Sequence, residues 1–180
     1  MPKSKPFRTQ RSSAIRSGRP HRRSGGGAID THKEIAVSKL FRIARAAEFE
    51  SLTAFREFID TTCAPLAGVD EALLYDLKLA VDEACSNIIK HGYAGMNPGS
   101  VILTIAPQPD RVVMTITDFG RAFEPSPLPA PDVDAALGGA ELGGFGLYFI
   151  YQTMDEVDYE TTEDGNHLTL IRRIPHSRPS

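Results

Sequence analysis

Residues 83–93 read E-A-C-S-N-I-I-K-H-G-Y, and the interpretation of the whole chain starts from this stretch. Its polar side chains Glu83, Asn87 and His91 stand four residues apart in an otherwise apolar helical pattern. Residues at that spacing share one face of a helix. A polar stripe on a helix that should belong to the core costs free energy unless something satisfies it. A metal ion with phosphates would satisfy it, and a solvated helix edge is the alternative.

The composition is that of a soluble globular domain. The chain has 180 residues, of which 41% are hydrophobic and 24% charged, and this size favours a single domain. No run of about 18 apolar residues occurs, so we expect no membrane span. Cys63 and Cys85 lie in apolar helical patterns without metal-ligand spacing. We expect both thiols to be reduced and buried, which fits a cytoplasmic protein.

The start of the chain differs from the rest in charge. Residues 1–29 contain eight Lys or Arg and no Asp or Glu, although the formal net charge of the whole chain is −3. Residues 1–31 are also rich in Ser, Gly and Pro, so we predict a disordered basic tail before a folded domain at 32–176. A transit peptide, a nucleic-acid-binding arm and a solvated tail all fit, and the solvated tail is favoured. The acidic body argues against nucleic acid as the partner of the folded domain.

Apolar periodicity predicts an alternation of strands and helices in the body of the chain. The predicted strands are 34–43, 100–106, 111–117, 156–162 and 166–173, and the predicted helices are 46–62, 70–92 and 146–154. A long loop rich in Pro and Gly precedes the last helix, and such a loop is typical of a lid or binding loop. Helices on one face of a mostly antiparallel sheet make an α+β two-layer sandwich.

Two further motifs flank the long loop. Asp118 ends a predicted strand two residues before Gly120, where the absence of a side chain lets a ligand approach. Its carboxylate could accept a hydrogen bond from an exocyclic amine such as that of adenine, or it could simply cap a turn. Residues 143–146, G-G-F-G, open directly into a helix, where backbone N–H groups favour an anion. An ordinary flexible lid has the same composition, and the run is not the P-loop pattern.

In their order along the chain, these three motifs resemble the N box, first glycine box and second glycine box of the GHKL ATPase and kinase superfamily. The H-G-Y end of the first motif and the closing G-N-H-L-T-L-I-R are most similar to the anti-sigma factor serine/threonine kinases. The resemblance covers about residues 34–173. It implies the Bergerat ATP-binding fold of the histidine kinase-like ATPases, with ATP and Mg²⁺ as cofactors.

The resemblance also implies a role for individual residues. Asn87 would coordinate Mg²⁺ through its amide oxygen, and Glu83 would be the general base near the γ-phosphate. Asp118 would recognise the adenine amine, with Thr169 assisting through water. The other positions implied at the nucleotide are His91, Gly120, Phe123, Gly143, Gly144, Gly146 and Leu147. For His91, and for Tyr93 beside it, organising the pocket and the helix end is favoured over a part in the chemistry.

One departure from the family pattern concerns positive charge. Phosphoryl transfer depends on cations near the γ-phosphate besides the metal. No Lys or Arg lies between Arg121 and Leu147, where related kinases often carry an arginine. Arg121 or Lys90 could substitute for it. The sequence therefore supports ATP binding more directly than phosphoryl transfer.

The hypothesis that follows is an ATP-dependent serine/threonine kinase that phosphorylates a STAS-domain anti-anti-sigma protein. It would also hold a sigma factor and act as a homodimer. A non-catalytic switch, in which ATP only controls partner affinity, is the first alternative. A catalytic fragment of a sensor histidine kinase is the second, but neither His21 nor His32 lies in the long helical pattern that a phosphoacceptor histidine needs.

Overall fold

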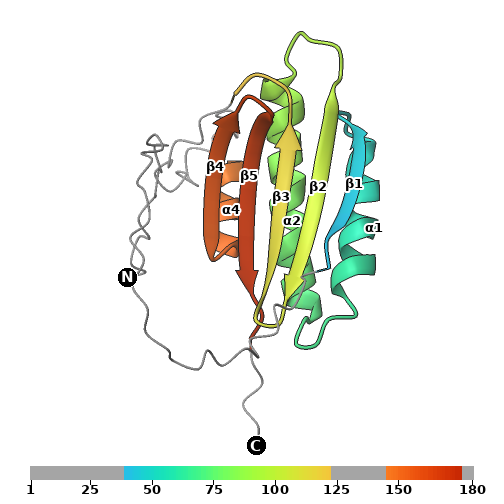
Figure 1. Cartoon of the computed structure of the whole chain (residues 1–180), viewed down its shortest axis with the longest axis vertical. Coiled ribbons are helices and arrows are strands. Elements are labelled where there is room, and N and C mark those ends of the chain that lie inside the picture. Colours follow the sequence, from blue (N-terminus) through green and yellow to red (C-terminus); the bar gives the residue numbers. More distant parts are fainter. Residues whose placement is uncertain (1–38, 123–144, 176–180) are drawn as a thin grey trace, which may run out of the picture.

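The computed structural model describes residues 39–122 and 145–175. Its elements are β1 (Phe41–Ala46), α1 (Ser51–Cys63), α2 (Glu71–Asn87), the π-helical turn η1 (Ile88–Gly92), β2 (Ser100–Gln108), β3 (Arg111–Asp118), α4 (Phe145–Thr153), β4 (Glu156–Thr162) and β5 (Gly165–Arg173). Among these residues, five strands form one antiparallel sheet in the order β1-β2-β3-β5-β4. The α-helices all cover the same face of the sheet (Figure 1). The predicted α+β two-layer sandwich is confirmed.

Helix α2 lies at the centre of the helical layer, between α1 and α4 (Figure 1). It begins where the Asp70 carboxylate accepts a hydrogen bond of 2.8 Å from the N–H of Leu73, a standard N-cap. Its core-facing side chains are Leu73, Leu77, Ala80, Val81, Ala84 and Cys85, all buried. Burial of each large apolar side chain stabilises the fold by roughly 1.5–3 kcal/mol. This packing holds the last turn of α2, with Glu83 and Asn87, in a fixed place over the sheet.

Strand β3 shows how the sheet separates its two faces. Val112, Met114, Ile116 and Asp118 are buried under the helices, whereas the residues between them are only partly buried on the other face. This is the period-two alternation of a strand. The sequence predicted the strand but not the face on which Asp118 lies. In the structure the Asp118 carboxylate lies on the helical side of the sheet, at the end of β3.

Some predicted boundaries were wrong. The helix predicted at 46–62 begins only at Ser51, because Ala46 still pairs with Ser100 in the sheet and the N–H of Ala47 bonds to the carbonyl of Gly99 at 2.8 Å. Phe49 therefore lies outside the helix and is 48% exposed. The strand predicted at 34–43 runs from 41 to 46, and residues 34–38 lie outside the described part. The predicted basic tail and nearly all of the predicted lid also lie outside it.

Both cysteines are free and buried, as predicted. Burial, with a smaller contribution from Asp60, raises the pKa of the Cys63 thiol to about 11. Burial raises the pKa of the Cys85 thiol further still. No helix in the described ranges is long and apolar enough to cross a membrane.

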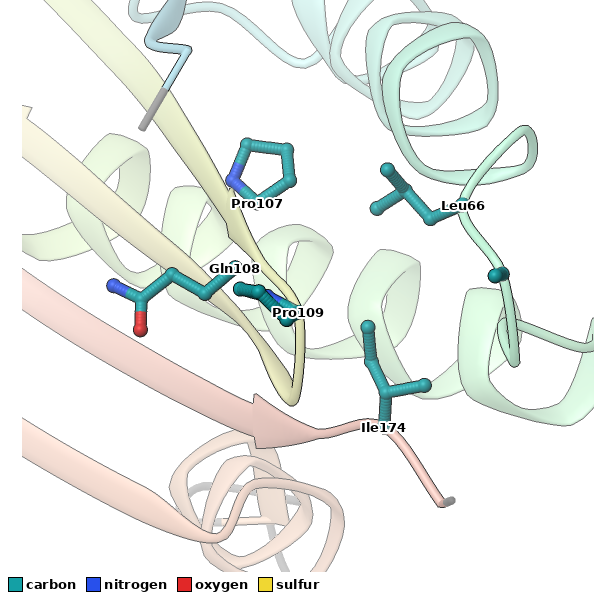
Figure 2. A pocket seen from close by; sticks show the side chains of 6 residues that line it. Leu66, Pro107, Gln108, Pro109 and Ile174 are labelled. Atoms are coloured by element: carbon teal, nitrogen blue, oxygen red, sulfur yellow. The ribbon is translucent and has the colours of Figure 1, made fainter. Parts of the chain in front are cut away.

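The β2–β3 turn forms one end of the molecule, opposite the end that carries Asp118. An apolar groove of roughly 310 Å³ lies there, and Figure 2 shows Leu66, Pro107 and Ile174 around it. Gly68 closes the loop behind the groove with a φ of +82°, and a β-carbon on it would lie 2.7 Å from Cγ2 of Ile174. This end therefore combines an apolar groove with a glycine-dependent turn.

Candidate functional site

The C-terminal end of α2 places two of the predicted polar residues together. Glu83 and Asn87 are one helical turn apart and both half-buried. After Asn87 the helix widens into η1, in which the N–H of Tyr93 bonds to the carbonyl of Ile88, five residues earlier, at 3.0 Å. His91 lies in this widened turn and is exposed, whereas Glu83 and Asn87 are half-buried. The structure therefore describes Glu83 and Asn87 as a half-buried pair, with His91 exposed beyond it.

The start of α4 lies against that pair. A β-carbon on Gly146 would stand 2.6 Å from Oε2 of Glu83 and 3.4 Å from Nδ2 of Asn87. Any side chain at this position would displace the Glu83 carboxylate. The structure therefore brings the second glycine motif to the first motif. Leu147 points into the core, with 8% of its surface exposed, while Gly143, Gly144 and Phe123 lie outside the described residues.

Asp118 is the last residue of β3, and a tight turn follows it. Its side chain is 5% exposed, and its Oδ1 accepts hydrogen bonds from the N–H of Gly120 at 2.9 Å and from Nδ2 of Asn166 at 3.0 Å. The turn is tied to the end of η1, because the N–H of Arg121 donates to the carbonyl of Gly92 at 2.8 Å. A β-carbon on Gly120 would lie 2.7 Å from that same carbonyl oxygen. Glycine is thus required where the two motifs meet.

Tyr93, the residue after η1, holds the same turn through its hydroxyl group. Its buried hydroxyl donates to the carbonyl of Ser100 and accepts from the N–H of Phe119, both at 3.1 Å. Burial is the main cause that raises the pKa of this phenol. The side chain joins the loop after η1, the start of β2 and the end of β3, which agrees with the prediction that it organises the helix end.

Sequence reasoning missed Asn166 and misplaced Thr169. Asn166 pairs with Asp118 in the β3–β5 register and is 3% exposed. Thr169 pairs instead with Thr115, with their hydroxyl oxygens 3.4 Å apart on the face of the sheet that the helices do not cover. Asn166, which pairs with Asp118, and Thr169 are three residues apart on β5, so their side chains point to opposite faces of the sheet. The structure therefore does not bring Thr169 to Asp118. The β3–β5 register, which pairs Asp118 with Asn166, would have identified Asn166.

The described residues fit a magnesium nucleotide. They contain no cluster of three or more His, Cys, Asp or Glu that could hold a metal alone. Mg²⁺ usually binds through one or two protein oxygens together with substrate phosphates, and the Asn87 amide can supply such an oxygen. Gly146 keeps side-chain bulk away from Glu83 and Asn87. The buried carboxylate of Asp118 can accept a hydrogen bond from a nucleobase.

The two cations that the sequence suggested near the phosphates are both exposed. The Lys90 ammonium lies 5.9 Å from the centre of the Phe49 ring, towards the start of α1. The contact of Arg121 with the site is a hydrogen bond from its backbone N–H to the carbonyl of Gly92. Lys90 lies within η1 and Arg121 bonds to its last residue, and neither of these two described side chains forms an ion pair with Glu83.

Comparison with known proteins agrees with this arrangement. The family model for the histidine kinase-like ATPase domain matches residues 45–172, more than half of the chain. The chain belongs to this family. The three motifs predicted membership of the GHKL superfamily of histidine kinase-like ATPases, and this prediction is confirmed. The family implies ATP binding.

Named relatives narrow the family further. The chain is 33% identical to the serine/threonine-protein kinase BtrW of Bordetella bronchiseptica over 107 residues, which cover 59% of this chain and 73% of BtrW. It is 30% identical to the serine-protein kinase RsbW of Bacillus licheniformis over 147 residues, covering 74% and 91%. It is 28% identical to the anti-sigma F factor of Anoxybacillus flavithermus over 135 residues, covering 73% and 92%. This histidine kinase-like ATPase thus belongs with the serine kinases of the anti-sigma factor type.

Proposed function

We propose that this protein transfers the γ-phosphate of ATP to a serine or threonine of a STAS-domain anti-anti-sigma protein, and thereby controls a sigma factor. The observation that carries the proposal is the contact of Gly146 with Glu83 and Asn87 at the start of α4. It puts a helix N-terminus, a carboxylate and an amide within one small volume. The relatives, two serine kinases and an anti-sigma factor, support the same reaction.

The residues of the chain divide the chemistry between them. The partner's hydroxyl oxygen attacks the γ-phosphorus, its proton passes to the Glu83 carboxylate, and the bond from the γ-phosphorus to the bridging oxygen breaks to release ADP. Asn87 would hold Mg²⁺, which when bound would neutralise charge on the phosphates. The amide N–H groups at the start of α4 would favour the negative charge of the phosphates. Asp118 accepts a hydrogen bond from the adenine amine and sets the position of the nucleotide.

A non-catalytic ATP switch is the second candidate, and the charge pattern favours it. No Lys or Arg occurs between Arg121 and Leu147, and Lys90 lies over Phe49. If no Lys or Arg reaches the γ-phosphate, as among the described residues near Glu83, nucleotide would alter the affinity for a partner without being turned over. In both cases a sigma factor and a STAS-domain protein are the proposed partners, and a homodimer is the proposed assembly.

Transfer of label separates the two candidates. The protein is incubated with Mg²⁺, ATP labelled at the γ-phosphate and a STAS-domain protein encoded beside its gene. We expect label on the partner, and loss of at least roughly 100-fold in rate with Glu83→Gln, which is the lower end of what a general base contributes. Glu57→Gln, on the exposed side of α1, is the matched control.

Two outcomes would argue against turnover. No label on the partner, or equal rates for Glu83→Gln and wild type, would exclude the kinase with Glu83 as its base. Partner binding that depends on ATP while no ADP forms would select the switch.

A further inference from the structure

Asn166 is a buried polar residue at the start of β5, and the proposed reaction gives it no part. We propose that Asn166 is a positioning residue which, together with Thr161 on β4, holds Asp118 so that the site selects a 6-amino purine over a 6-oxo purine. The inference rests on the proposed role of Asp118 at the base.

The hydrogen bonds around Asn166 fix the orientation of its amide. Nδ2 donates to Oδ1 of Asp118 at 3.0 Å and to the carbonyl of Gly120 at 3.1 Å. An ionised carboxylate and a carbonyl can only accept hydrogen bonds, so the NH₂ group must face them. The amide oxygen then faces Thr161, whose hydroxyl donates to it at 3.1 Å. Each donor in the chain from Thr161 to Asp118 therefore meets an acceptor.

This network leaves one oxygen of Asp118 for a ligand. Both hydrogen bonds that the described residues give to the carboxylate, from Gly120 and from Asn166, end at Oδ1. Held on that side by two donors, the carboxylate cannot rotate without breaking both. Oδ2 is then a fixed acceptor at the end of β3.

A fixed acceptor discriminates between purines by chemistry. The 6-amino group of adenine donates a hydrogen bond to it, whereas the 6-oxo group of hypoxanthine or guanine presents a second acceptor and leaves both oxygens unpaired. A site built to pair with a polar group rejects an analogue that cannot pair, because buried groups are then left unsatisfied. Asn166 and Thr161 are the residues that keep this side of Asp118 in place.

The test measures the affinities of the full chain for ATP and for inosine triphosphate, which carries the 6-oxo group, by calorimetry between pH 6 and pH 8.5. In Asn166→Asp two carboxylates face each other, and a shared proton can restore the lost hydrogen bond only at lower pH. We expect ATP affinity roughly 10-fold or more below wild type at pH 8.5, recovering as the pH falls. Asn97→Asp, an exposed position, makes the same change of charge and should follow wild type at every pH.

Thr161→Val tests the network by a second, gentler change. Valine keeps the shape of the side chain but removes the hydroxyl that holds the amide oxygen. We expect a loss of roughly 2- to 10-fold in ATP affinity and a smaller ratio between ATP and inosine triphosphate. Thr104→Val, on the other face of the sheet, is the control and should change neither quantity.

Asp118→Asn is measured alongside to separate the two claims. If Asp118→Asn loses the preference for ATP while Asn166→Asp and Thr161→Val behave as wild type at every pH, the positioning role is wrong and the role of Asp118 stands. If Asp118→Asn itself binds both nucleotides as wild type does, both claims are wrong. A pH-dependent loss in Asn166→Asp together with a reduced ratio in Thr161→Val would support the inference.

Discussion

The two ends of the sheet are closed in different ways. At the β2–β3 turn, Leu66, Pro107 and Ile174 line a groove of apolar carbon atoms. At the other end, two polar residues, Asp118 and Asn166, are buried among the apolar ones. The groove at the first end is lined mainly by apolar side chains, while the N–H of Ile174 bonds to the carbonyl of Asp110 and Arg111 pairs with Asp110 at the turn. The second end buries a carboxylate and its hydrogen-bond partners. If no ligand bound there, apolar side chains at these positions would stabilise the fold more.

Gly68 at the apolar end and Gly146 at the polar end illustrate how the two ends differ. A β-carbon on Gly68 would lie 2.7 Å from a methyl carbon of Ile174, and one on Gly146 would lie 2.6 Å from a carboxylate oxygen of Glu83. The two distances are almost equal, but the neighbours differ. A substitution at Gly68 presses on the core, whereas one at Gly146 moves the end of a flexible polar side chain. The first should change stability and the second should change function.

The largest effect is expected from Asp118→Asn. The amide can still accept hydrogen bonds from Gly120 and Asn166, but it turns a donor towards the adenine amine. A lost hydrogen bond to a charged group and an unpaired donor together cost about 3 kcal/mol, or roughly 100-fold in affinity. Calorimetry with ATP measures the loss, and thermal unfolding should show an intact fold. Asp158→Asn, exposed on β4, is the control, and an equal loss in that variant would contradict the account.

Gly146→Ala should come next and should act on transfer more than on binding. The new methyl group displaces the Glu83 carboxylate, and a misplacement of about 1 Å can cost up to roughly 100-fold in rate. We expect phosphoryl transfer to fall by that order while the unfolding midpoint stays close to that of wild type. A drop in stability with the rate preserved would place Gly146 in the core instead of the site.

Gly68→Ala is the counterpart at the apolar end. The φ of +82° is strained for a residue with a side chain, and Ile174 must also give way. We expect a loss of about 1–3 kcal/mol in the free energy of unfolding, measured with denaturant, and no change in ATP affinity below the melting transition. Weaker ATP binding in the folded variant would show that the two ends are coupled.

The smallest effect concerns the two thiols, one at each end of the helical layer. Thiol reagents attack the thiolate, and burial raises the pKa of Cys63 to about 11 and that of Cys85 still higher. At pH 8 we expect both to react only through unfolding, at one common rate that ATP slows. Mass spectrometry after labelling distinguishes the sites. Faster labelling of Cys85 alone would reveal local opening at the site end.

Much of the fold was predictable because it depends on local periodicity. The apolar repeat of α2 and the alternation of β3 located both elements, and the four-residue spacing placed Glu83 and Asn87 together. The π-helical turn was not predictable from local periodicity, and its last residue, Gly92, contacts Gly120 and Arg121, which are distant in sequence. The misplaced Thr169 has a similar cause. Its face of the sheet follows from the β3–β5 register, and strand periodicity without a register does not say which residue meets Asp118.

The central claim is that the end of α2 holds the metal of a bound magnesium nucleotide, and Asn87→Ala tests it most directly. ATP is titrated calorimetrically into wild type and variant, each with Mg²⁺ and with the metal chelated. The account predicts that wild type binds ATP more tightly with Mg²⁺, and that Asn87→Ala binds weakly with no such dependence. An Asn87→Ala protein with unchanged affinity and unchanged dependence on Mg²⁺ would contradict it.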